Sequence, residues 1–84
     1  MDAKKTEEVL REIIARVTRK DVSELAKADD LVEALGIDSL AGLRVLAAVE
    51  KHFEVRFPDE RLGEFRTMNR VLEFIETKNG KEKS

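Results

Sequence analysis

The sequence contains no cysteine among its 84 residues and a single histidine, His52. The absence of cysteine excludes disulfides, zinc–thiolate sites and cysteine nucleophiles together, and it leaves the redox compartment open. The acidic residues Asp29, Asp30 and Glu33 lack the spacing and the glycine of a calcium-binding loop. We therefore expect no metal site and no catalytic residues that depend on one.

Long apolar runs and basic runs are also missing. No stretch is apolar enough to cross a bilayer, and the charged start of the chain, residues 1–8, does not resemble a signal peptide. The 16 Lys and Arg residues stand against 18 Asp and Glu residues, for a formal net charge of −2. We expect a cytoplasmic protein with no membrane span and no nucleic-acid partner, because the usual basic footprint is lacking.

Hydrophobic residues make up 42% of the chain and charged residues 40%, a balance that suits short amphipathic helices. The length fits one small domain with one core. We expect the domain to occupy residues 1–80, with Asn79 and Gly80 ending the last helix. Residues 81–84 should form a disordered tail.

The first helix is predicted by apolar residues spaced three and four positions apart, with charged residues between them. These are Leu10, Ile13, Ile14 and Val17. The helix should end near Arg19 and Lys20, since basic residues suit the negative end of a helix dipole. Residues 21–38 then lose helical spacing and are interpreted as a long ordered loop, held to the core by Leu31, Leu35 and Ile37.

The second helix should begin where Asp38 or Ser39 caps free backbone N–H groups, and it should end near Phe53. Its inward stripe is Val45, Val49 and Phe53. Gly42 either weakens the first turns or permits a close approach, and the sequence does not separate these two roles.

Two further helices follow. Pro58 opens a short third helix, with acidic Asp59 and Glu60 at its positive end. Thr67 caps a fourth helix, whose inward stripe is Met68, Val71, Leu72 and Ile75. The prediction is an all-α fold of four helices with a long ordered loop between the first and second.

The run from Asp30 to Phe53 centres on the triplet Asp38, Ser39 and Leu40. This triplet, after an acidic loop and before the turn Pro58-Asp59-Glu60, resembles the acyl carrier protein family. The similarity continues through Thr67, Val71, Phe74 and Ile75, so it covers most of the chain. The resemblance implies a four-helix bundle of acyl-carrier type with a short helix 3.

The resemblance also implies a function without catalysis. In the family, a phosphopantetheinyl transferase moves a 4'-phosphopantetheine arm from coenzyme A onto the serine, here Ser39, and the arm holds acyl groups as thioesters. Asp38 matches the acidic residue thought to assist arm transfer, and Leu40 completes the motif. Enzymes that load and transfer acyl groups are the implied partners of a carrier that works as a monomer.

A self-contained serine hydrolase is disfavoured on independent grounds. Ser39 and His52 lie at opposite ends of one predicted helix. A rise of about 1.5 Å per residue separates them by roughly 20 Å, too far for His52 to act as the base.

The chain departs from the common family pattern on the second helix. Ala41, Arg44 and Lys51 stand where ordinary fatty-acid-synthesis carriers have acidic residues. Complementary charge sets encounter rate and partner choice, so we expect partner docking at Leu43, Arg44, Ala47 and Lys51 with dedicated enzymes. Simple core packing is an equal interpretation for Leu40 and Leu43. The expected role is in a specialised lipid, lipopolysaccharide or polyketide pathway.

Two alternatives remain. An aminoacyl or peptidyl carrier uses the same arm, but its loop more often ends in paired glycines, where this chain has Leu35, Gly36 and Ile37. A helical interaction module without any covalent arm is the alternative from a different class. The interior could also part to shelter an acyl chain, unless bulky Phe57 and Phe65 limit the space.

Overall fold

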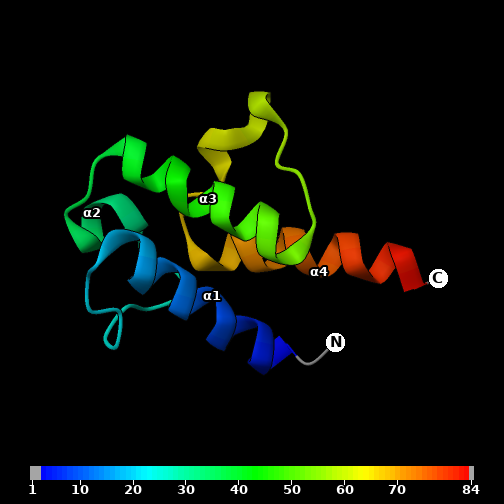
Figure 1. The fold of residues 1–84 in the computed structure, drawn as a ribbon, viewed down its shortest axis with the longest axis horizontal. Coiled ribbons are helices and arrows are strands. Elements are labelled where there is room, and N and C mark those ends of the chain that lie inside the picture. Colours follow the sequence, from blue (N-terminus) through cyan, green and yellow to red (C-terminus); the bar gives the residue numbers. More distant parts are fainter. Residues whose placement is uncertain (1–2, 84) are drawn as a thin grey trace.

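The computed structural model describes residues 3–83, and all regular structure in that range is helical. Figure 1 shows the arrangement of the helices α1 (Ala3–Thr18), α2 (Leu31–Leu35), α3 (Ser39–Phe53), η1 (Asp59–Glu64) and α4 (Met68–Lys83). The predicted all-α fold is confirmed, with α1, α3 and α4 as the long helices and η1 as a single short 3-10 segment. None of the described helices is both long and apolar enough to span a membrane.

The connection between α1 and α3 is not the uninterrupted loop that the sequence predicted, because it contains the short helix α2. The Asp30 side chain accepts a hydrogen bond from the Glu33 N–H group, and Gly36 closes the helix at φ 64°. Leu31 and Leu35, one turn apart, are both buried. A cap and two core contacts stabilise this short helix. A segment of this length shows no helical periodicity in the sequence. The predicted role of Leu31, Leu35 and Ile37 as anchors is confirmed.

The long helices α3 and α4 begin at their predicted caps. Asp38 is the N-cap of α3, which settles the choice between Asp38 and Ser39. The Thr67 hydroxyl accepts a hydrogen bond from the Arg70 N–H group at 3.2 Å, so Thr67 caps α4 as expected. Pro58 is the N-cap of η1, with Asp59 and Glu60 in its first turn.

The end of α4 differs from the prediction. The helix continues through Asn79 and Gly80 to Lys83, so the expectation that these two residues end it is wrong. Glycine adopts right-handed helical angles at a cost of only about 1 kcal/mol, so it need not end a helix. The boundary between a domain of residues 1–80 and a tail of residues 81–84 stays a prediction, and Ser84 lies outside the described residues.

The core lies where α1 packs against α3 and α4. Its fully buried members come from all three long helices and include Leu10, Ile14, Val45, Val49, Met68, Val71 and Ile75. Three phenylalanines extend the core toward η1. The ring of Phe57 lies 4.7 Å from that of Phe65 and 4.8 Å from that of Phe74, measured between centroids. These contacts hold η1 beside α3 and so form one wall of the region around Ser39.

Candidate functional site

Ser39 is the first residue of α3 and is exposed. Its hydroxyl makes no hydrogen bond with any residue that the structure describes. Because Ser39 is exposed and its hydroxyl has no partner among the described residues, a second protein can reach it.

Asp38, the preceding residue, has a structural task. One carboxylate oxygen, Oδ1, accepts a hydrogen bond from the Ala41 N–H group at 2.8 Å. The Asp38 carbonyl accepts one from the Gly42 N–H group at 3.2 Å. Asp38 thereby holds the first turn of α3 in place, and its second carboxylate oxygen accepts no hydrogen bond from the described residues.

The start of α3 suits a phosphodiester. Backbone N–H groups in the first turn of a helix lack intrahelical acceptors, and the aligned peptide dipoles give this end partial positive charge. A phosphate bonded to the Ser39 oxygen would lie at that positive end. The residues present thus fit a phosphopantetheine arm.

The surroundings of Ser39 do not make it a nucleophile by themselves. His52 is the penultimate residue of α3, so about 20 Å of helix separates it from Ser39 at about 1.5 Å per residue. Among the described residues, no three His, Cys, Asp or Glu side chains gather as a metal site. His52 therefore lies too far from Ser39 to act as its general base.

A mostly apolar cavity of about 180 Å³ opens beside Ser39, between α2, α3 and η1. Its only polar side chains are Ser39 and Arg66. The remaining lining consists of Leu31, Val32, Gly42, Leu43, Val45, Leu46, Leu62, Gly63 and Phe65. Phe65 lines the cavity, whereas Phe57 lies behind it against Phe65 and Phe74.

Gly42 faces this cavity from α3. A Cβ atom at this position would lie 3.7 Å from the Val32 side chain, an ordinary contact distance. Its backbone is helical, and only Gly36 among the described glycines has a positive φ. The Val32 side chain does not come too close to Gly42 for a Cβ atom, so packing within the chain does not require glycine here.

Arg66, one of the residues that line the cavity, forms an ion pair with Asp30. The Arg66 guanidinium donates to both carboxylate oxygens of Asp30, at 2.6 and 3.2 Å. The Arg66 carbonyl also accepts from the Leu31 N–H group at 2.8 Å. The side-chain hydrogen bonds from Arg66, followed by the backbone bond from Glu33, lower the pKa of Asp30 from its ordinary value of 3.8.

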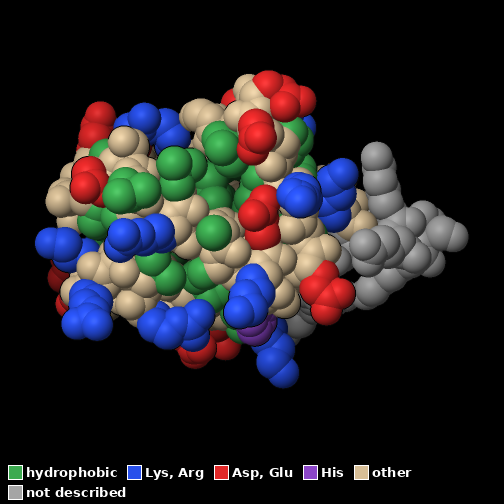
Figure 2. All heavy atoms as spheres, turned by 45° about the horizontal axis from the view of Figure 1, so that its top comes forward, with side chains coloured by type: hydrophobic (Ala, Val, Ile, Leu, Met, Phe, Trp, Pro, Cys, Tyr) green, Lys and Arg blue, Asp and Glu red, His purple; other side chains and the backbone are tan. Residues whose placement is uncertain are grey.

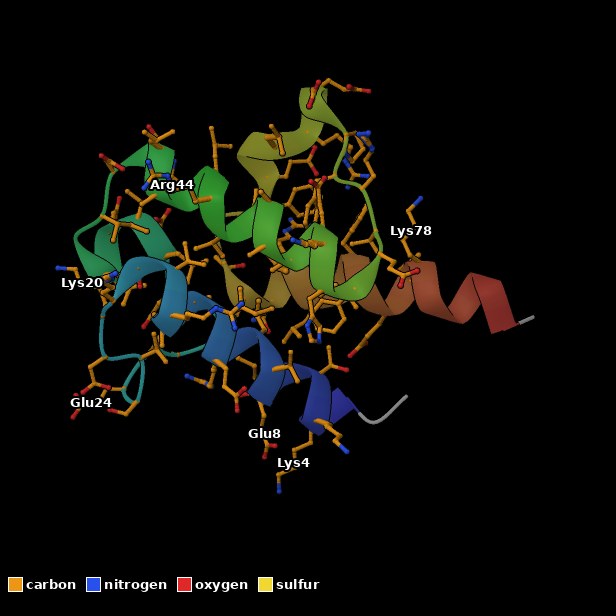
Figure 3. The ribbon with its side chains drawn as sticks, viewed as in Figure 1. Lys4, Glu8, Lys20, Glu24, Arg44 and Lys78 are labelled. Atoms are coloured by element: carbon orange, nitrogen blue, oxygen red, sulfur yellow. The ribbon has the colours of Figure 1, made fainter. Side chains whose placement is uncertain are left out.

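The four residues expected to dock partners share one exposed side of α3. Leu43, Arg44, Ala47 and Lys51 are all exposed, and the Leu40 side chain retains 57% of its accessible surface. Leu43 is 46% exposed and also lines the cavity. It therefore fills its alternative role as a core residue only in part. Figure 3 shows Arg44 near the beginning of α3, far from Lys78 on α4.

Sequence reasoning missed the opposite wall of the cavity. Val32, Leu62, Gly63 and Arg66 come from α2, η1 and the connection to α4. The one available signal was Asp30 followed three positions later by Glu33, which is typical of a capped helix start. Nothing in the sequence indicated that Arg66 pairs with a carboxylate 36 positions away.

Comparison with known proteins is consistent with this geometry. The family model described as "Phosphopantetheine attachment site" matches residues 8–75. The anthracycline acyl carrier protein DauA of Streptomyces sp. (strain C5) is 41% identical over 68 residues, covering 79% of this chain and 81% of the relative.

The names of two other relatives refer to other pathways. The polyketide-8 synthase acyl carrier protein 2 of Streptomyces avermitilis is 33% identical over 73 residues, covering 87% of this chain and 84% of its own. The meromycolate extension acyl carrier protein of Mycolicibacterium aurum is 36% identical over 67 residues, covering 80% and 69%.

The exposed serine at a capped helix start lies within the residues that the family model matches. The chain belongs to the phosphopantetheine-binding acyl carrier protein family. Its cofactor is 4'-phosphopantetheine, and proteins of this family work with phosphopantetheinyl transferases and synthase enzymes.

Proposed function

We propose that Ser39 is the attachment residue and that the chain carries acyl intermediates in a specialised pathway. The single observation that carries the assignment is the exposed Ser39 hydroxyl at the first position of α3, without an internal hydrogen-bond partner. When bound, the arm supplies a terminal thiol that holds the acyl group as a thioester. The chain's own part is to present that attachment point on a rigid helix.

Asp38 and Leu40 assist from either side of Ser39 in this proposal. Asp38 uses one carboxylate oxygen for capping, at 2.8 Å from the Ala41 nitrogen, and keeps the other for the transferase site. Such an oxygen is a suitable ligand for a magnesium ion used in that enzyme. Leu40, exposed at 57%, offers an apolar contact beside the attachment point.

A polyketide or specialised lipid role is supported by the relatives named above, which act in anthracycline, polyketide and meromycolate systems. We propose that this chain serves a pathway of that kind as a cytoplasmic monomer. An aminoacyl or peptidyl carrier is the alternative within the same mechanism. Intact-mass measurement of the carrier from its native host distinguishes them, because an aminoacyl adduct would overturn the acyl assignment.

The cavity beside Ser39 is the proposed shelter for part of the acyl chain. Its lining is apolar except for Ser39 and Arg66, and each methylene that leaves water contributes about 0.8 kcal/mol. Phe65 limits its depth, while Phe57 acts indirectly by holding Phe65.

The attachment site is tested by incubating the apo protein with coenzyme A, magnesium and a promiscuous phosphopantetheinyl transferase. We expect the wild-type mass to rise by one arm and the Ser39→Ala mass to stay constant. Ser23→Ala, which alters another exposed serine, is the matched control and should accept one arm. A mass gain in Ser39→Ala, or none in the wild type, would favour an interaction module or a different attachment residue.

A further inference from the structure

We propose that the exposed side of α3 docks onto an acidic, partly apolar surface at the active-site entrance of an acyl-loading or acyl-transferring enzyme. This inference rests on the proposed function, because it concerns the enzyme that meets the arm at Ser39. It specifies the partner by chemistry: carboxylate side chains beside an apolar recess.

The first argument is the position of the exposed leucines. Leu40 and Leu43, exposed at 57% and 46%, are the large hydrophobic side chains left at the surface of the described residues. Both lie within four positions of Ser39. Isolated exposed leucines are ordinary, but two beside an attachment residue form a continuous apolar contact.

The second argument is helical register. With about 100° of rotation per residue, Leu40, Leu43, Arg44, Ala47 and Lys51 fall within a stripe roughly 100° wide. The stripe runs about 16 Å along the helix from Leu40 to Lys51. Ala47 lies between the two cations and leaves room for an opposing side chain. One rigid face therefore presents apolar and basic groups together.

The third argument is charge. Between the N-cap Asp38 and the C-cap Glu54, the exposed Lys, Arg, Asp and Glu side chains of α3 are Arg44 and Lys51. Glu50, the acidic residue of this helix, is partly buried and accepts the Phe57 N–H group at 2.7 Å. Within the described part of the chain, neither Arg44 nor Lys51 forms an ion pair. Both cations are free to meet carboxylates of a partner.

Acidic side chains also gather on η1, beside this basic side. Figure 2 shows exposed hydrophobic side chains with a row of Lys and Arg below them and a group of Asp and Glu at the top of the view. The acidic residues of η1 include Asp59 and Glu60. A partner surface with carboxylates attracts the domain when it faces Arg44 and Lys51. The same surface repels the domain when it faces the acidic residues of η1.

The experiment first identifies the enzyme and then measures its encounter with the carrier. A wild-type carrier loaded at Ser39 with a bromoacetyl-pantetheine arm captures, from native-host extract, an enzyme whose active-site cysteine displaces the bromide. That enzyme is then purified. Its association rate is measured by stopped flow with holo wild type, Arg44→Glu/Lys51→Glu and the control Lys5→Glu/Lys78→Glu. The two double variants change net charge equally, and the control residues are exposed on α1 and α4.

We expect the association rate of Arg44→Glu/Lys51→Glu to fall at least 10-fold at low salt and that of the control less than 2-fold. The difference should nearly vanish at about 1 M salt, where the screening length is about 3 Å. Replacing the facing enzyme carboxylates by lysine should restore the rate of the α3 variant. Leu43→Ala should instead raise the dissociation rate.

Equal rates for both double variants, or a faster rate for the α3 variant, would overturn the inference. Wild-type carrier that sediments with phosphatidylglycerol vesicles and captures no enzyme would also overturn it, since the basic side would then face lipid. Intact mass checks that every variant carries the arm. An unmodified Ser39 refutes the proposed function, whereas a loaded carrier with a charge-insensitive enzyme refutes this inference alone.

Discussion

Replacing Gly42 by alanine should stabilise the protein, although glycine at this position lines the proposed cargo cavity. Gly42 lies inside α3 with helical backbone angles, so no positive φ requires glycine there. The added Cβ would lie 3.7 Å from the Val32 side chain and would contact it without a clash. The substitution therefore removes the helical cost of glycine and adds one apolar contact.

The expected gain in the free energy of unfolding is about 0.5–1 kcal/mol, mainly because alanine restricts the unfolded chain. For a domain of this size, that gain raises the Tm by roughly 2–8 °C. Urea unfolding followed by circular dichroism measures the first quantity, and a thermal scan of the same samples measures the second. The apo protein is used throughout, so that no cargo contributes.

Gly36→Ala is the matched control, because the chemical change is identical and the expected change in stability has the opposite sign. Gly36 has φ 64°, and a Cβ there meets no atom within 4 Å. Only backbone strain changes, and it should cost about 1–2 kcal/mol. Equal destabilisation by both substitutions would refute the reasoning, since it would mean that Gly42 is required by packing. The methyl group should also weaken protection of a long acyl thioester against hydrolysis by narrowing the cavity.

Three further predictions concern the contacts around the site. Ile75→Ala removes a fully buried side chain and should lower the free energy of unfolding by about 2–5 kcal/mol, measured in urea. Glu50→Ala leaves the Phe57 N–H group without its acceptor and should lower the free energy of unfolding by about 1 kcal/mol. Glu50→Gln should lower it by only part of that amount. Because Arg66 lowers the pKa of folded Asp30, this pair stabilises the fold above the ordinary pKa of 3.8, and the stabilisation disappears as pH falls through the lower folded pKa. Asp30→Asn should therefore flatten the acid end of the stability–pH curve, and an unchanged curve would contradict the assigned role.

The helices that could be predicted from the sequence are those with repeated local signals. α1, α3 and α4 each combine apolar spacing with a capping or charged residue near an end, and these signals act within a few positions. Ser39 could be singled out for the same reason, because Asp38, Ser39 and Leu40 are adjacent in the sequence. Errors arose where local signals were weak or ambiguous: the single turn of α2, and glycine at position 80.

By itself, the sequence determined the class of fold, the position of Ser39 at a helix start and the unusual basic residues of α3. Each of these depends on neighbours along the chain or on one helical period. Only the tertiary structure decided what lies beside Ser39. The cavity has walls from α2, α3 and η1, and the Asp30–Arg66 ion pair joins residues 36 positions apart. Such contacts form because distant segments bury apolar surface together, and no local pattern records which segments will meet.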